Sequence, residues 1–363
     1  MTTGTIGAAR ADERMAELGM ARKIFRRPEV GAVIGAAVVW LFFAVVAPEN
    51  WISVRGVARI LDPSSTLGIM AVAVALLMIG GEFDLSTGVM TGTAGLIAGL
   101  LATELGMNIW LAMFLALVFA LAVGYINGLM VIKTGLPSFI VTLATFFILR
   151  GANVGVTRLL VNQVRVGGID KATGFEAARL VFNTEISIWD TEFRTTIIWW
   201  LVLTALATWV LLRTKYGSWI FAVGGDANAA RNVGVPSDRV KIALFMTTAG
   251  AAWLVGIMND LRLRSAVASQ GIGQEFVYII AAVIGGCLLT GGYGSAVGAA
   301  VGAVIFGMAQ VGIVFAGWDT DWFFSFLGIM LLAAVLVNNY TRKRAEAVTV
   351  AVAKSRKEED EED

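Results

Sequence analysis

Long apolar stretches, separated by short polar segments, follow one another along almost the whole chain. An α-helix needs about 20 mostly apolar residues to cross a bilayer. Ten stretches meet or approach this length, and each is predicted to be a membrane span: Val30–Ala47, Ser64–Gly81, Leu85–Leu105, Ile109–Ile132, Pro137–Thr157, Thr195–Leu212, Lys241–Asn259, Phe276–Leu289, Ser295–Gly317 and Trp322–Tyr340. The second, fifth and eighth are the weakest, because they are short or contain Gly and polar residues. The pattern predicts an all-α polytopic membrane protein.

The polar segments divide the chain into parts. An N-terminal segment, 1–29, precedes a transmembrane domain, 30–340, and a charged tail, 341–363, follows it. Within the membrane domain the two longest polar loops cover residues 158–194 and 213–240. A further short stretch, Ile52–Leu61, predicts an amphipathic helix on the membrane surface ahead of the second span.

Composition agrees with the hydropathy pattern. Apolar residues make up 57% of the chain and charged residues 15%, whereas soluble domains carry about a quarter charged residues. The polar N-terminal segment leads into a span too long for the apolar core of a cleavable signal, so we expect none. The chain has no His and a single Cys287, which excludes His ligands, an internal disulfide and a cysteine metal cluster.

Catalytic motifs are missing as well. The sequence contains no GxxxxGK[ST], HExxH, GxSxG or CxxC pattern. We therefore expect no catalytic residue, bound cofactor or metal, no nucleic-acid partner, and membrane lipid around the spans. If the protein transports a solute, its energy comes from another subunit, because strongly charged positions inside the spans are too scarce for a self-contained ion-coupled carrier.

Basic residues near span ends predict the orientation, since Lys and Arg accumulate on the cytoplasmic side. Six of them lie in the segment 1–29, and Arg342, Lys343 and Arg344 follow the last span. With ten spans both termini are then cytoplasmic. The same count makes 213–240 a cytoplasmic loop and 158–194 a periplasmic loop, in which basic and acidic residues balance.

A conspicuous break between spans reads GGEFDLSTG, from Gly80 to Gly88. Its polar residues Glu82, Asp84 and Ser86 allow two interpretations. Asp84 or Ser86 caps the third span, with negative charge at the positive end of its dipole. Alternatively, the carboxylates line a polar path through the membrane. A similar IGG sequence begins a second break, Ile284–Ala299, and suggests a weak internal repeat of the kind that transporters carry.

Further polar groups at the edges of spans are candidates for the same path. They are Asn127, Pro137, Ser138 and Thr142. Pro137 stands in the first turn of a predicted helix, where proline is well tolerated. The hydroxyl groups that follow it either contact a hydroxylated solute or bond to the backbone.

The loop 213–240 contains a short helix signal. Gly224 and Gly225 are expected to break the incoming chain, Asp226 to act as N-cap, and Gly234 to end the helix as its C′ residue, with Pro236 soon after. Asn228, Ala229 and Ala230 lie between them, and the alanines favour a helix that another surface approaches closely. A structured basic loop on the cytoplasmic side is typical of a docking segment.

Four blocks together resemble the permease subunits of bacterial ABC importers for ribose, xylose and related monosaccharides. They are Gly80–Gly88, Asn127–Gly151, Tyr216–Val235 and Ile284–Ala303, and the resemblance extends from about Leu67 to Asn339. It implies a fold like that of type II ABC importers. The Ala229, Ala230 and Gly234 positions match the AAxxxG core of the helix by which such permeases couple to their ATPase.

The resemblance also implies partners. ABC ATPase subunits bind the cytoplasmic side, a periplasmic sugar-binding protein delivers the solute, and a second permease copy completes a homodimer in the bacterial inner membrane. The implied solute is a monosaccharide or a similar polyhydroxylated molecule. A polyol, a nucleoside or a furanose signal in the same type of machine stays open, and so does an ion-coupled carrier.

Overall fold

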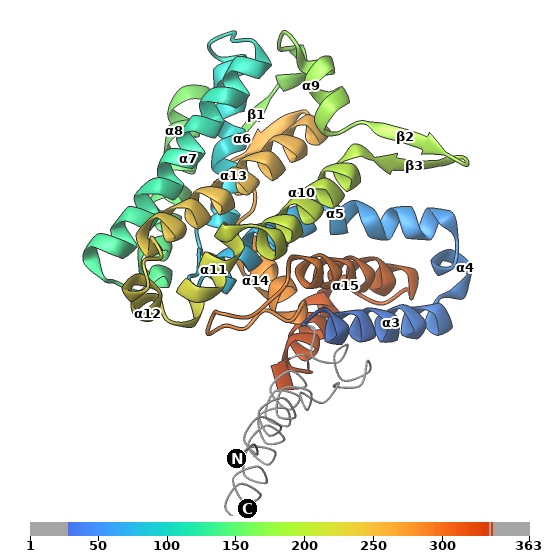
Figure 1. The fold of residues 1–363 in the computed structure, drawn as a ribbon. Helices are drawn as coiled ribbons and strands as arrows, with labels where there is room; N and C mark the ends of the chain where they lie inside the picture. The colour runs from blue at the N-terminus through green and yellow to red at the C-terminus, as the bar shows by residue number, and fades with distance from the viewer. Residues whose placement is uncertain (1–27, 334, 337–363) are drawn as a thin grey trace, which may run out of the picture.

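The computed structural model describes residues 28–333 and 335–336, which form a bundle of helices (Figure 1). Within this part of the chain seven helices are long and apolar enough to cross a membrane. They are α3 (Pro28–Val46), α5 (Val54–Ile79), α7 (Ile109–Thr134), α8 (Ser138–Val161), α10 (Thr195–Arg213), α13 (Ser237–Leu263) and α15 (Ala296–Phe315). Three shorter apolar helices are α6 (Thr87–Thr103), α14 (Gln274–Ile284) and Thr320–Ala333, which opens with the 3-10 turn η2 (Thr320–Trp322).

Each of the ten predicted ranges thus overlaps an apolar helix, although only seven of these helices have full spanning length. The segment 1–29 falls almost wholly outside the described residues, as do the end of the last predicted span and the tail 341–363.

The interpretation of Ile52–Leu61 as a separate surface helix was wrong. Residues Val54–Ile79 form one continuous helix, with Pro63 inside it. Proline removes a backbone donor and usually breaks a helix. Here the Ser64 and Ser65 hydroxyls donate to the carbonyls of Ile60 and Asp62, so the turn around Pro63 has additional hydrogen bonds.

The all-α prediction was also too simple. Strand β1 (Arg165–Gly167) pairs antiparallel with β4 (Ser265–Val267), and β2 (Glu185–Ile188) pairs antiparallel with β3 (Thr191–Arg194). The β2–β3 turn places two non-glycine residues, Trp189 and Asp190, at positive φ. Two-residue hairpin turns favour such angles but usually use Asn-Gly or Asp-Gly, so Trp189-Asp190 does not indicate a hairpin at the level of sequence.

Burial separates inner from outer helices. In the most apolar 18-residue stretch of α5, 78% is buried inside the molecule, whereas in that of α3 only 17% is buried. The helices α10, α13, α14 and α15 pack around α5, while the outer faces of α7, α8 and α10 carry exposed apolar side chains such as Phe114, Phe147 and Leu201. Such faces suit contact with lipid.

The bundle has two different ends (Figure 1). The short helices α11 (Lys215–Gly225) and α12 (Ala227–Asn232) lie at one, here called the α12 end. The hairpin β2–β3, the β1–β4 pair, α9 (Phe175–Phe182), η1 (Ile169–Lys171) and α4 (Pro48–Trp51) lie at the other, the hairpin end. The predicted loop 158–194 is therefore a structured unit, and the predicted loop 213–240 consists mainly of helix.

Candidate coupling segment and helix breaks

Both ends of α12 are formed by the residues that the sequence predicts. The Asp226 carboxylate accepts hydrogen bonds from the backbone N–H groups of Asn228 (2.9 Å) and Ala229 (3.0 Å), as an N-cap does. Gly234 follows the helix with φ +88° and donates to the Arg231 carbonyl at 3.0 Å. Glycine adopts this angle without steric cost. The predicted N-cap and C′ residue are confirmed.

The expected break at Gly224 and Gly225 was placed wrongly. Both are the last residues of α11, and the chain turns at Asp226. Gly224 serves close packing instead, because a Cβ there would overlap the carbonyl oxygen of Ile79. Gly225 has open space beside it. A single glycine pair thus combines one position that needs the absence of a side chain with one that does not.

Ala229 and Ala230 of α12 differ in exposure. Ala230 is 4% exposed and packs against its own chain, while Ala229 and Asn228 are exposed. Val233, just past the helix, is 81% exposed. Ala230 is therefore not part of the surface that a partner could contact. An ion pair of 2.7 Å between Arg231 and Asp238 joins α12 to the start of α13.

The helices α5 and α14 end with the same backbone geometry. In each, three successive N–H groups bond back onto the last helical turn, and the second glycine has positive φ, 84° at Gly81 and 93° at Gly286. The bonds run from Gly80, Gly81 and Glu82 to the carbonyls of Leu76, Met78 and Leu77, and from Gly285, Gly286 and Cys287 to those of Ala281, Val283 and Ala282. The two IGG sequences therefore also share a three-dimensional form.

The two breaks also contact each other. Gly292 donates its N–H to the Ile79 carbonyl at 2.9 Å, and a Cβ at Gly291 would lie 2.7 Å from the Gly81 Cα atom. Gly224 of α11 packs into the same place. We call Gly81, Gly224, Gly291 and Gly292 the glycine junction. At this junction three backbone segments, distant in sequence, lie in direct contact.

Asp84 is the centre of a buried polar network at the first break. Its carboxylate accepts from the Ser86 N–H (2.9 Å), from the Ser86 hydroxyl, and from the Thr248 hydroxyl of α13 (2.9 Å). Ser86 occupies the N-cap position of α6 but makes no side-chain cap bond. Asp84 thus holds the turn ahead of α6 rather than capping α6 itself.

Candidate residues from α7 and α8 complete this network. Asn127 donates to the Ser86 hydroxyl at 3.1 Å. The hydroxyls of Ser138 and Thr142 accept from the backbone N–H groups of Phe83 and Leu85, each at 3.0 Å. Pro137 precedes α8 as its N-cap residue and is exposed, outside the network.

The remaining candidate, Glu82, forms an ion pair with Lys241 in the first turn of α13. Sequence reasoning missed Lys241 and Thr248, because both lie more than 150 positions from their partners and no local pattern connects them. The structure brings together Glu82, Asp84, Ser86, Asn127, Ser138 and Thr142 around one break, with their polar groups bonded to each other, to α13 or to the break's backbone. That any of them lines a path stays a prediction.

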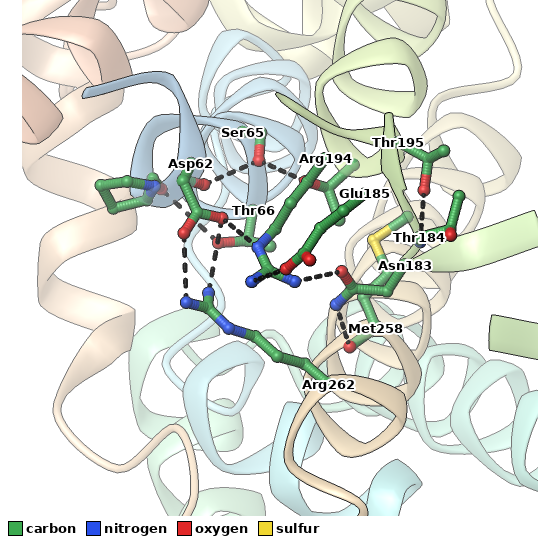
Figure 2. A network of polar contacts seen from close by, with 12 residues as sticks. Asp62, Ser65, Thr66, Asn183, Thr184, Glu185, Arg194, Thr195, Met258 and Arg262 are labelled. Atoms are coloured by element: carbon green, nitrogen blue, oxygen red, sulfur yellow. Dashed lines mark hydrogen bonds and ion pairs between the residues drawn. The ribbon is translucent and has the colours of Figure 1, made fainter. Parts of the chain in front are cut away.

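A second network, at the hairpin end, was not anticipated from the sequence (Figure 2). Asp62 of α5 forms ion pairs of 3.1 Å with Arg194 and with Arg262 of α13. Arg194 also pairs with Glu185 of β2 at 2.6 Å and donates to the Asn183 side chain at 3.1 Å. The cluster fastens the β2–β3 hairpin onto two inner helices.

Comparison with known proteins bears on the whole membrane part. Residues 56–335 match the family described as branched-chain amino acid transport system, permease component. The chain belongs to this family. Among curated relatives, the ribose import permease protein RbsC of Escherichia coli K12 is 30% identical, with 86% of this chain and 94% of RbsC aligned.

Two further Escherichia coli K12 permeases are similar. The xylose transport system permease protein XylH is 29% identical, covering 87% of this chain and 93% of its own. The inner membrane ABC transporter permease protein YjfF is also 29% identical, covering 82% and 88%. No solved structure matches the chain. The predicted resemblance to ribose- and xylose-type ABC permeases is confirmed: this family member is a multi-pass inner-membrane transport subunit and not an enzyme.

Proposed function

We propose that the chain is the membrane subunit of an ATP-driven importer that moves a monosaccharide, or a similar small polyhydroxylated solute, across the bacterial inner membrane. The similarity to RbsC and XylH along most of the chain carries this proposal, and because these relatives are ribose and xylose permeases, pentoses are the first solutes to test. The rest of the machine follows: ATPase subunits, a periplasmic sugar-binding protein, and a second copy of this permease.

The coupling segment in this proposal is α12 with its flanks. A capped helix with exposed Asn228, Ala229 and Val233 at the α12 end suits a groove on a cytoplasmic ATPase. This assignment of α12 requires ten spans with both termini cytoplasmic. The binding protein then docks at the hairpin end. Uptake of labelled D-ribose and D-xylose by proteoliposomes containing all subunits is the direct test. ATP-dependent uptake is expected. If the complete importer takes up neither pentose and no other monosaccharide, the proposal is refuted.

Val233→Asp tests the coupling surface. A charge at this exposed apolar position would be desolvated in the docked complex, so it should weaken ATPase association by about 2 kcal/mol, roughly 30-fold, and reduce transport accordingly. Membrane abundance should not change, because the side chain is exposed. Co-purification of the ATPase measures the effect.

The matched control is Leu180→Asp, an exposed leucine on α9 at the hairpin end, which should leave ATPase association intact. Ala230→Asp gives the opposite pattern: the buried position should lower abundance before it affects docking. If Val233→Asp retains full association and transport, α12 is not the coupling helix.

A further inference from the structure

A pocket of about 430 Å³ lies among α5, α6, α13, α14, α15 and the helix after η2. Its volume falls within the range of roughly 300–1,000 Å³ typical of small-molecule sites. Three carboxamides contribute to its lining, Asn259, Gln274 and Gln310, together with aromatic side chains that include Phe306 and Phe323. We call it the amide pocket. It contains none of the polar residues that surround the first helix break.

The three carboxamides differ in burial: Asn259 and Gln274 are half-buried and Gln310 is exposed. None of them has a hydrogen-bond partner among the described residues. By contrast, the amides of Asn127 and Asn183 each donate and accept within the protein. An amide offers two donors and an acceptor, so this pocket presents several unused groups of both kinds.

Their surroundings exclude lipid as the natural partner. Asn259 and Gln310 belong to helices long and apolar enough to span the membrane, and polar side chains in such segments almost always face protein or a water-filled cavity. The lipid-compatible faces of α7, α8 and α10 expose apolar side chains instead. The amide pocket therefore faces water or a bound solute.

The chemistry of the lining defines the class of solute. No Asp or Glu lines the pocket, and its one cationic residue, Arg262, is already paired with Asp62 at 3.1 Å. Amides bond equally well to the donor and acceptor sides of hydroxyl groups, and aromatic rings pack against apolar surface. This combination fits a neutral, polyhydroxylated ring and does not fit an anion or a cation.

A second, separate pocket lies at the hairpin end. It has a volume of about 570 Å³ and is lined by charged residues that include Arg59, Asp62, Glu185 and Arg194. Asp62 lines this outer pocket and Arg262 lines the amide pocket, so one residue of the ion pair belongs to each pocket. Figure 2 shows this pair. A solute arriving at the hairpin end would meet this pair before the amides.

We propose that the amide pocket is where the permease contacts its solute during passage, through the free carboxamides of Asn259, Gln274 and Gln310. This inference rests on the proposed import function. It moves the solute contact away from Glu82, Asp84 and Thr142, whose polar groups are bonded within the protein.

Cysteine labelling tests the pocket without requiring transport. Cys287 is buried and is the only native cysteine, so Cys287→Ala gives a clean background. In this background Gln310→Cys should react with a charged, membrane-impermeant methanethiosulfonate, while Val118→Cys on the outer face of α7 should not. Excess D-xylose or D-ribose should slow the labelling of Gln310→Cys at least about twofold. Two results would overturn the inference. One is that neither position is labelled, as would happen if a second copy covered the pocket. The other is that Gln310→Cys is labelled at a rate that neither pentose slows.

Transport by the complete importer provides the second test. Gln310→Met and Gln274→Met keep the side-chain length but remove the hydrogen bonds. Loss of one neutral hydrogen bond should lower the uptake rate by about 2- to 10-fold and change the ratio of D-ribose to D-xylose uptake. Val118→Met is the control and should transport normally. Wild-type uptake ratios in both Met variants, at normal abundance, would refute the amide pocket. Failure of the wild-type importer to move any monosaccharide would instead refute the proposed function.

Discussion

Asp84 receives three hydrogen bonds at a site that is 2% exposed. Buried polar groups of this kind are stabilising only while every partner is satisfied. The sequence left two interpretations of this carboxylate, a cap or part of a path. Its contacts do not cap α6: one oxygen accepts from the N–H group of Ser86, ahead of the helix, and the other accepts from Thr248 of α13. That the carboxylate lines a path stays a prediction.

Removing this carboxylate should therefore affect folding more than specificity. Asp84→Ala removes the acceptor of the Ser86 N–H and hydroxyl groups, at a cost of about 1–3 kcal/mol for each buried group left unpaired, while the Thr248 hydroxyl can still donate to the Phe245 carbonyl. The melting temperature and membrane abundance of the variant should both fall. Asp84→Asn, which keeps the shape and one acceptor oxygen, should lose much less. Normal abundance combined with a changed sugar preference would instead favour a role in the path.

Single residues also show where sequence reasoning reaches its limit. The roles of Asp226 and Gly234 follow from local chemistry, since a cap and its helix are neighbours in sequence. Lys241 and Thr248 are found only in three dimensions, because nothing near them indicates Glu82 or Asp84. The free amides of the amide pocket were partly visible as polar residues in apolar spans, but the sequence did not group them.

Among the elements, the ends of α5 and α11 illustrate two different reasons for a glycine. A glycine provides either an unusual backbone angle or the room that a missing side chain leaves. Gly81 has a positive φ, while Gly224 is helical and leaves room for the Ile79 carbonyl. Sequence alone could not separate these cases, which is why the predicted break before α12 was displaced to Asp226.

The neighbouring glycines give a matched pair of variants. Gly224→Ala should destabilise the protein by about 1–3 kcal/mol or more, because a backbone atom stands where the methyl group would go. Gly225→Ala, with open space, should be neutral or slightly stabilising, since alanine favours helix by up to about 1 kcal/mol. Thermal unfolding in detergent measures both. Equal tolerance of the two changes would contradict the close contact between α11 and the end of α5.

The lengths of α6 and α14 also escaped sequence analysis. Hydropathy registers how far an apolar run continues and not where the helix inside it stops. The predicted eighth span continues to Leu289, but α14 ends at Ile284, where Gly285 and Gly286 turn the chain. Glycine-terminated helices within apolar sequence therefore reduce the number of full-length spans without reducing the number of apolar helices.

For the whole molecule, the order and type of most elements could be predicted because each apolar helix is marked by its own composition. The β2–β3 hairpin and its attachment could not, because they depend on ion pairs between Asp62, Arg194 and Arg262 across the fold. The two ends of the bundle nevertheless correspond to the two predicted loops. The remaining question at this scale is which end faces the cytoplasm.

Ten spans with both termini inside predict the outcome of a fusion experiment. Green fluorescent protein at the C-terminus should fluoresce, because it matures in the cytoplasm. Alkaline phosphatase inserted at Asp190, in the hairpin turn, should be active, and the same insertion at Gly234 should be inactive, given the basic residues around α12. Activity at Gly234 would invert the orientation and remove the basis for ATPase docking at that end.

The glycine junction has a mechanical consequence. Side chains packed between two elements can absorb a small displacement, because their rotamers can shift. No side chain separates Gly224 from the backbone of Ile79, Gly291 and Gly292, so backbone packs directly on backbone there. A displacement of α11 toward the bundle must therefore move the end of α5 and the turn between α14 and α15 at the same time.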